Sequence, residues 1–449
     1  MLSFFLRLPA RWPHVVMLTV AAVWGVVAFL TAPLFEVVYV TSGRGVLILS
    51  GYVLAFILGS WAVSVVHQSS PPPQRPAAPT GGLDMRFAFV GAIICALTGI
   101  GLRLYDRLIL RGTELGLGEI ARRKIDVALT ANESPIGLIA APLTGFCFLP
   151  AMLVLLNPKL TSKPIRYMAF AIALFPPFEA VYFQGGTSVV ALALLLLLSV
   201  LATRPAPAQP ARKKPRRHLT FPQQIGLIAA GGSALVLGGW MFTARVNAIA
   251  GSVSQYLIYA AGSNANVVVP SQLALRIMDV PVFGQIAFVI YWISLYVTSG
   301  VYNLFYVLER GFIFHTQGAT QTQVFLRAFD ILTGNATRPS VADSNPLAGL
   351  YQTMFGDVFL DFGVIGGLVQ CLLMGVIAAL FHRARLKGNS AAGIIDPILK
   401  TFLMMGVFVS SLSSFGLFVL LAAMALILLA ALSPRPRGNL VMPVARRAS

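Results

Sequence analysis

Two carboxylates stand four residues apart, Asp357 and Asp361, at the point where a polar segment runs into a long apolar stretch. At this spacing two side chains share one face of a helix. Because a carboxylate that enters a membrane is costly, the pair indicates a functional site. The alternative is that both lie at headgroup level at the start of a helix, where the macrodipole stabilises negative charge.

Side chains that could accept a proton from a hydroxyl group are few in this part of the chain. The candidates are Asp343, Asp330, Asp357 and His315. We expect a carboxylate to act ahead of His315, because the surrounding HTQGATQTQ indicates a flexible polar stretch that would fix geometry poorly. Asp357 is favoured as a proton acceptor because it stands at the start of a helix, which is a rigid support. It could instead serve as a helix cap.

Arginines supply a second chemical signal. Arg103, Arg107 and Arg111 recur every four residues, which stacks them on one helix face. Region 243–353 contains arginines and no lysine, and guanidinium offers phosphate a bidentate fork where ammonium is a point charge. An ion pair with a nearby acid is the simpler explanation for any one arginine, but the set favours anion binding. The candidates are Arg107, Arg111, Arg122, Arg245, Arg310, Arg327 and Arg338.

Aromatic residues lie in or beside the same region, and Tyr296, Tyr302 and Tyr351 are the candidates for contact with a sugar. Aromatic rings stack on the C–H faces of sugars. The competing explanation is the ordinary belt of tyrosine and tryptophan at a membrane interface.

Composition identifies the elements that must position these groups. The chain has 449 residues, of which 57% are hydrophobic and 11% charged, so we expect an all-α polytopic membrane protein. The net charge of +18 comes largely from basic segments flanking apolar runs, so membrane topology explains it better than nucleic-acid binding. The three cysteines lie in apolar runs and predict neither a disulfide framework nor a metal site. No motif indicates a cofactor or a soluble nucleotide donor.

Ten apolar runs are long enough to cross a membrane. They cover residues 15–33, 46–66, 85–102, 136–156, 165–183, 187–202, 225–242, 354–381, 391–411 and 413–432. An eleventh segment, 282–308, cannot be a simple crossing if both termini lie on one side. We therefore expect a re-entrant or interfacial helix pair broken around Ser299–Gly300, which gives about 10 to 12 membrane helices in all.

The distribution of lysine and arginine predicts the orientation. Basic segments at 203–222 and 434–449 are expected to be a cytoplasmic linker and tail, which puts both termini in the cytoplasm. The linker separates an N-terminal membrane half, 1–202, from a C-terminal half, 223–433. The loops 103–135 and 243–353 then face the opposite side.

Three patches resemble the bacterial oligosaccharide repeat unit polymerases, also called O-antigen polymerases. They are YDRLILRG at 105–112, YVTSGVYNLFYVLE at 296–309 and YQTMFGDVFLDFGVIGG at 351–367. This family often has glutamine before the glycine of the second patch, where this chain has Ser299. The resemblance implies a GT-C-like fold in the bacterial inner membrane, with the two loops in the periplasm.

The resemblance also implies the reaction. A glycan on undecaprenyl diphosphate would be transferred to the non-reducing end of a new lipid-linked repeat unit. Arginines would stabilise the leaving diphosphate, and a carboxylate or histidine would accept the hydroxyl proton. The implied partners are the undecaprenyl-diphosphate-linked oligosaccharide, the bilayer, a chain-length regulator and a flippase.

Two alternatives stay open. A ligase-like transferase would move the glycan to a different acceptor. A transporter or flippase of lipid-linked oligosaccharide would place ionisable residues in broken membrane helices, for which Glu179 is the better candidate. Asp396 and Lys400, at helical spacing, are expected to form a structural ion pair.

Overall fold

A computed structural model of the chain describes part of the 449 residues. The described residues are 7–37, 43–68, 84–112, 134–184, 188–204, 267–278, 280, 283–309, 315–322, 325–326, 329, 333, 353–411 and 414–432. The expected span at 225–242, the basic linker beyond residue 204 and the basic tail lie outside these ranges.

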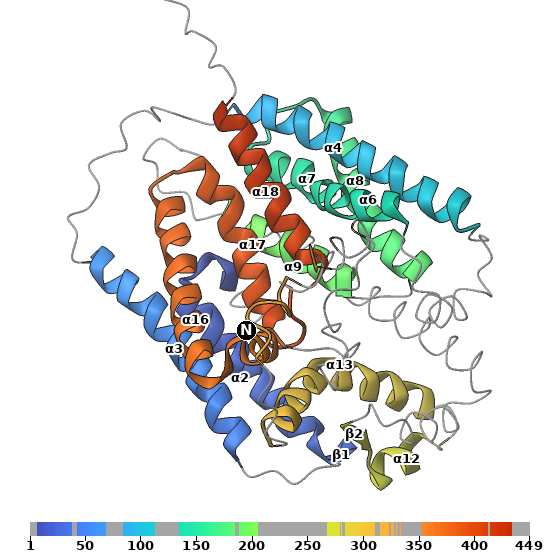
Figure 1. Ribbon diagram of the computed structural model, residues 1–449, viewed down its shortest axis with the longest axis vertical. Helices are drawn as coiled ribbons and strands as arrows, with labels where there is room; N and C mark the ends of the chain where they lie inside the picture. The colour runs from blue at the N-terminus through green and yellow to red at the C-terminus, as the bar shows by residue number, and fades with distance from the viewer. Residues whose placement is uncertain are drawn as a thin grey trace, which may run out of the picture.

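Helices make up almost all of the described structure (Figure 1). The α-helices are α2 (Pro13–Thr31), α3 (Arg44–Gln68), α4 (Met85–Tyr105), α6 (Pro135–Thr144), α7 (Phe148–Leu156), α8 (Lys163–Gln184), α9 (Ser188–Thr203), α12 (Gln272–Met278), α13 (Phe283–Glu309), α16 (Met354–Leu386), α17 (Ser390–Gly406) and α18 (Phe415–Leu432). Short turns are η1 (Leu8–Ala10), η2 (Ala32–Leu34), the π-helical η3 (Asp106–Leu110) and η5 (Gly145–Cys147), and two strands are β1 (Phe35–Val37) and β2 (Val268–Pro270).

Six helical segments are long and apolar enough to cross a membrane, or seven if a bent pair in α13 forms one span. They are Pro13–Leu34, Arg44–Val66, Met85–Leu110, Pro135–Leu156, Met354–Leu386 and Phe415–Leu432. The chain is therefore an all-α polytopic membrane protein. The expected runs at 165–183, 187–202 and 391–411 also form helices, α8, α9 and α17, but these do not meet the same criterion. The described residues thus contain fewer qualifying spans than the ten expected.

Two hydrophobic cores divide the helices. The first joins α2, α3, α13 and α16 and includes Tyr52, Phe288 and Phe355. The second joins α4, α7, α8, α9, α17 and α18 and includes Leu149 and Ile398. Each core combines helices from before and after the basic linker, so the two halves of the sequence interleave in space (Figure 1).

Glycines bring α3 and α16 into backbone contact. A Cβ atom on Gly59 would overlap the carbonyl oxygen of Leu372, and one on Gly375 would overlap that of Phe56. A Cβ atom on Gly367 would lie 2.6 Å from the Tyr52 hydroxyl. Small residues at such crossings allow the close van der Waals packing that drives helix association in lipid. These two helices run side by side along one edge of the molecule (Figure 1).

Helix α13 is bent by 45° between segments Ile286–Leu295 and Val297–Glu309. The expected break around Ser299–Gly300 was placed a few residues too late along the chain. Near the bend, the Trp24 indole N–H donates to the carbonyl of Val297 at 2.9 Å. This contact ties α2 to the bent helix, whose geometry fits either a broken span or a re-entrant pair.

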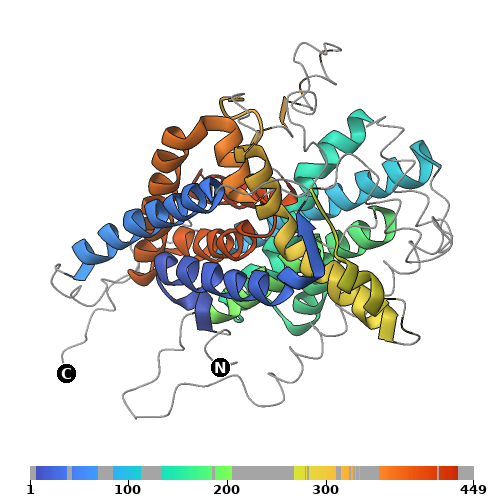
Figure 2. The ribbon, with the colours of Figure 1, turned by 90° about the horizontal axis from the view of Figure 1, so that it is seen from below.

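Strands β1 and β2 pair antiparallel and place two distant segments together (Figure 2). Phe35 lies opposite Pro270 and Val37 opposite Val268. Next to this pair, the Ser271 hydroxyl donates to the carbonyl of Pro33 at 2.7 Å. Because β1 follows the C-terminal end of α2, strand β2 and helix α12 (Gln272–Met278) lie at that end of the bundle.

Candidate functional site

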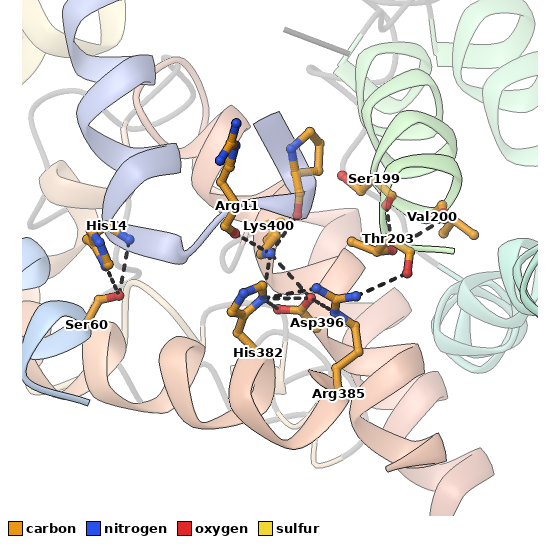
Figure 3. Close-up of polar contacts among 11 residues, drawn as sticks. Arg11, His14, Ser60, Ser199, Val200, Thr203, His382, Arg385, Asp396 and Lys400 are labelled. Atoms are coloured by element: carbon orange, nitrogen blue, oxygen red, sulfur yellow. Dashed lines mark hydrogen bonds and ion pairs between the residues drawn. The ribbon is translucent and has the colours of Figure 1, made fainter. Parts of the chain in front are cut away.

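The opposite end of α2 lies beside a buried polar cluster (Figure 3). Lys400 Nζ donates to the carbonyls of Pro9 and Arg11, each at 2.6 Å, and to His382 Nδ1 at 2.8 Å. The three ammonium protons are thus used, and Asp396 lies 3.4 Å away. Since Nδ1 accepts from Lys400, its contact with Asp396 is not a hydrogen bond.

Arg385 connects this cluster to α9. Its Nε donates to Asp396 Oδ2 at 2.6 Å, and its Nη1 donates to the carbonyl of Thr203 at 3.1 Å (Figure 3). Asp396 and Lys400, whose charged groups lie 3.4 Å apart, form the expected structural ion pair. The N-terminal turn and the ends of α9 and α16 meet at one end of the bundle, away from β1 and β2.

Helix length locates the other end. About 20 residues of helix cross the hydrocarbon core. Counted from His382 along α16, this length reaches Phe362, next to Gly363; counted from Met85 along α4, it reaches Tyr105. Phe362 thus lies about one span length along α16 from the Lys400 cluster, and Tyr105 lies about one span length along α4 from Met85. We treat the regions around them as two parts of a candidate site.

The first part is an arginine cluster on α4 and η3. Arg103 Nε lies 2.9 Å from Glu179 Oε1, and Arg107 Nη2 lies 3.4 Å from the same oxygen. Arg111 Nε lies 3.1 Å from Asp106 Oδ2. Arg107 is only 5% exposed and Asp106 is fully buried. Three cations therefore share two carboxylates in a region largely closed to solvent.

A π-turn sets the register of this cluster. Helix α4 continues past the expected end at Leu102 and widens at η3, so Arg107 and Asp106 turn inward together. The Ser134 hydroxyl donates to Asp106 Oδ1 and accepts from the Gly137 N–H at 3.0 Å. The N-terminus of α6 is thereby fixed against the acidic side of the cluster.

Two buried donors of this cluster are left over. Among the described residues, Arg107 Nε and Arg111 Nε have no hydrogen-bond partner, and only Arg111 Nε has a carboxylate oxygen, Asp106 Oδ2, within 3.1 Å. A buried N–H of this kind is costly unless an acceptor reaches it. Together with the excess of positive charge, it makes the arginine cluster able to take an anion.

The second part is the start of α16, where Asp357 and Asp361 are 2% and 1% exposed. Neither carboxylate is the N-cap of this helix, so the capping alternative is wrong. Thr353 is the cap, since its side chain accepts from the Gly356 N–H at 3.0 Å. Asp357 lies in the first turn, where the macrodipole still favours its charge.

Asp361 binds a segment that lies some forty residues earlier in the chain. Its carboxylate accepts from the Thr316 hydroxyl, from the Thr320 N–H at 2.8 Å and from the Gln321 N–H at 3.1 Å. The backbone adds two bonds, from the Thr316 N–H to Leu360 O and from the Gln317 N–H to Asp361 O, both 3.0 Å. Residues 315–322 are thus fixed on α16, and the expected flexible stretch around the histidine was wrong for them.

Gly363 interrupts α16 directly after Asp361, with φ 66° and ψ −165°. Its carbonyl accepts from the Tyr52 hydroxyl at 2.9 Å. A Cβ at Gly363 would lie 2.5 Å from His315 Cε1, so only glycine leaves room for the ring there. His315 also lies edge-on to Phe359, with ring centroids 6.3 Å apart.

Some of the other predicted site residues belong to the described part of the chain, and the rest lie outside it. Tyr302 is half-buried and its ring lies 6.4 Å from that of Phe35, so it packs beside β1. Tyr296 belongs to α13, but its side chain is outside the described part. The remaining candidates also lie outside the described residues: Arg122, Arg245, Arg310, Arg327, Arg338, Asp330, Asp343 and Tyr351.

Small cavities and metal sites add little here. A cavity between α13 and α16, lined in part by Gly300, Asn303 and Phe359, has room for about one water molecule. No group of His, Cys, Asp or Glu able to hold a metal occurs among the described residues.

Sequence reasoning missed three contributors, Ser134, Gly363 and the contacts of Asp361. The glycine directly after FLDF was the one local signal of a helix break.

Comparisons of this chain with protein families, with curated proteins and with solved structures give no match.

Proposed function

We propose that this protein is a glycosyltransferase that polymerises undecaprenyl-diphosphate-linked oligosaccharide repeat units at the periplasmic face of the bacterial inner membrane. The observation that carries the proposal is the buried arginine cluster, with three cations, two carboxylates and an Arg107 Nε that lacks a partner among the described residues. Its position at the end of α4 suits the headgroup of a lipid whose chain stays in the bilayer.

A diphosphate leaving group fits this cluster for chemical reasons. Negative charge develops on the diphosphate oxygen as its bond to the anomeric carbon breaks. Fixed guanidinium groups at a site closed to water stabilise that charge more than they would in solution. Arginine also binds two oxygens at once, which orients the lipid-linked donor.

The acceptor hydroxyl needs a group that takes its proton. The candidates remain Asp330, Asp343, Asp357 and His315, of which the described residues include the last two. Asp357 and His315 both belong to the junction of α16 with the preceding segment. A site on this junction would hold the acceptor about one span length along α16 from the Lys400 cluster.

Lipid-linked oligosaccharides from a strain that lacks the protein test the proposal directly. A polymerase defect leaves single repeat units on the lipid at the periplasmic face, and the wild-type gene restores long chains. Full-length polymer that stays on the lipid would indicate a ligase instead. Absence of outward-facing units would indicate a flippase, and either result would overturn the proposal.

A further inference from the structure

Residues 315–322 form a folded strap on α16, and the carboxylate of Asp361 is its main attachment. Asp361 is almost fully buried, yet its bonds all lead to this one segment. A reciprocal amide pair strengthens the attachment, because Gln321 and Gln370 each donate to the other at 3.2 and 2.9 Å. Left-handed φ values at Gln317 (50°) and Gly318 (94°) turn the strap back on itself. Only the first residue of the strap, His315, has a side chain suited to proton transfer.

His315 occupies a position that the break in α16 creates. Gly363 removes the Cβ that would collide with the ring, and Phe359 lies edge-on to the imidazole. Despite these contacts the histidine remains exposed. The ring is therefore fixed by backbone and aromatic contacts while it stays open to a reactant.

We infer that Asp361 and Gly363 form a positioning device that holds His315 as the proton acceptor of the transfer, an inference that rests on the proposed function. In that step the acceptor hydroxyl oxygen forms a bond to the anomeric carbon. The bond from this carbon to the diphosphate oxygen breaks, and the diphosphate leaves with the bonding electron pair. His315 takes the hydroxyl proton and later returns it to water. Asp361 touches no reactant and acts through the strap.

A labelling experiment tests the strap without any reference to activity. Ala319→Cys, in the half-buried middle of the strap, is reacted with an impermeant maleimide in the full-length protein, and the chain without this cysteine serves as the blank for the three native cysteines. Thr316→Val and Asp361→Asn should raise the labelling rate about tenfold. The first removes a hydrogen bond to the carboxylate, and the second removes the negative charge and replaces one of the two acceptor oxygens with a donor. Thr322→Val is the matched control, since its hydroxyl bonds Gly318 within the strap. Unchanged labelling in both variants overturns the strap.

Turnover by the purified protein with lipid-linked repeat units tests the assignment of His315. His315→Ala should lower kcat about 10²–10⁴-fold. Added imidazole should restore part of the rate, whereas pyrrole, which has the same shape and no basic nitrogen, should not. Asp361→Asn should lower kcat about 10²-fold with KM little changed, because misplacement affects the reacting geometry. Full activity of His315→Ala overturns the assignment.

The outcomes separate this inference from the proposed function. Long chains made by His315→Ala, with faster labelling of Asp361→Asn, would leave a polymerase with a structural strap and overturn the inference alone. Failure of the wild-type gene to restore polymer overturns the proposed function and the role of His315 together.

Discussion

Arg107 is the residue at which the electrostatics of the arginine cluster are least balanced. It shares the carboxylate of Glu179 with Arg103, and Arg111 takes the carboxylate of Asp106. An isolated buried charge is costly, so an unshared cation here needs an anion. The pairing of Glu179 with two arginines also weakens its case as the ionisable group of a transporter.

Arg107→Lys should therefore abolish long polymer although it preserves the charge. Ammonium cannot reproduce the bidentate fork, and removal of one donor that stabilises the transition state costs about 10²–10³ in rate. The measurement is polymer length in the complemented deletion strain at matched protein abundance. Arg166→Lys is the control, because that arginine donates to the Thr161 carbonyl near the opposite end of the bundle. Normal polymer from Arg107→Lys would contradict a fork-like contact with the lipid diphosphate.

The types and spacing of the residues predicted the arginine cluster. They did not predict contacts between residues that are far apart in the sequence. The four-residue spacing of the arginines placed Arg103 and Arg107 on one face, and both do contact Glu179. No local pattern shows that Asp361 binds Thr320 and Gln321, because that contact depends on how the chain returns after a long intervening segment. For the same reason the sequence around His315 predicts a flexible segment, which is wrong for residues 315–322.

At the scale of elements, hydropathy predicted where the apolar helices lie, but it predicted more spans than qualify among the described residues and it predicted their interruptions poorly. The expected run at 136–156 matches Pro135–Leu156, and that at 85–102 begins with α4 at Met85. The π-turn after α4 and the break in α16 at Gly363 follow from specific contacts, which averaging over a window of residues hides. The pairing of β1 with β2 joins segments over 200 residues apart, beyond the reach of any local pattern.

The crossing of α3 and α16 makes a prediction about stability. Gly375→Ala should destabilise the protein by about 1–3 kcal/mol, because the new methyl group would overlap the Phe56 carbonyl and push the helices apart. Gly25→Ala is the matched control within a membrane helix. Its Cβ would meet nothing within 4 Å, and alanine is the better helix former. Thermal unfolding in detergent measures both, and equal stability of the two variants would contradict a tight α3–α16 contact.

At the scale of the whole molecule, the Lys400 cluster joins parts that are far apart in sequence. Lys400 binds carbonyls just before α2, while Arg385 links α16 to the end of α9 and to Asp396. The two hydrophobic cores meet near this cluster, since α17 contributes side chains to both. The cluster therefore fixes how the interleaved halves sit on one another.

Lys400→Met should destabilise the protein by about 3–5 kcal/mol, the cost of breaking a buried ion pair from one side. It would leave the carbonyls of Pro9 and Arg11 without this donor and Asp396 with fewer cations. Lys387→Met removes an exposed lysine near the same end of α16 and should change little. Unfolding of both variants in detergent is the measurement, and a Lys400→Met protein as stable as the control would show that the cluster is dispensable.

The orientation of the protein in the membrane is predicted from the basic segments at one end of the helix bundle. The basic linker and tail predict that the Lys400 end is cytoplasmic, so Ser449→Cys and Lys387→Cys should resist an impermeant maleimide in intact cells. Thr322→Cys, exposed on the strap at the other end, should react, and it serves as the positive control for reagent access. Permeabilised cells should label all three, which shows that protection comes from the membrane and not from burial. Labelling at Ser449 in intact cells would reverse the topology, and the arginine cluster and His315 would then face the cytoplasm, where periplasmic polymerisation could not use them.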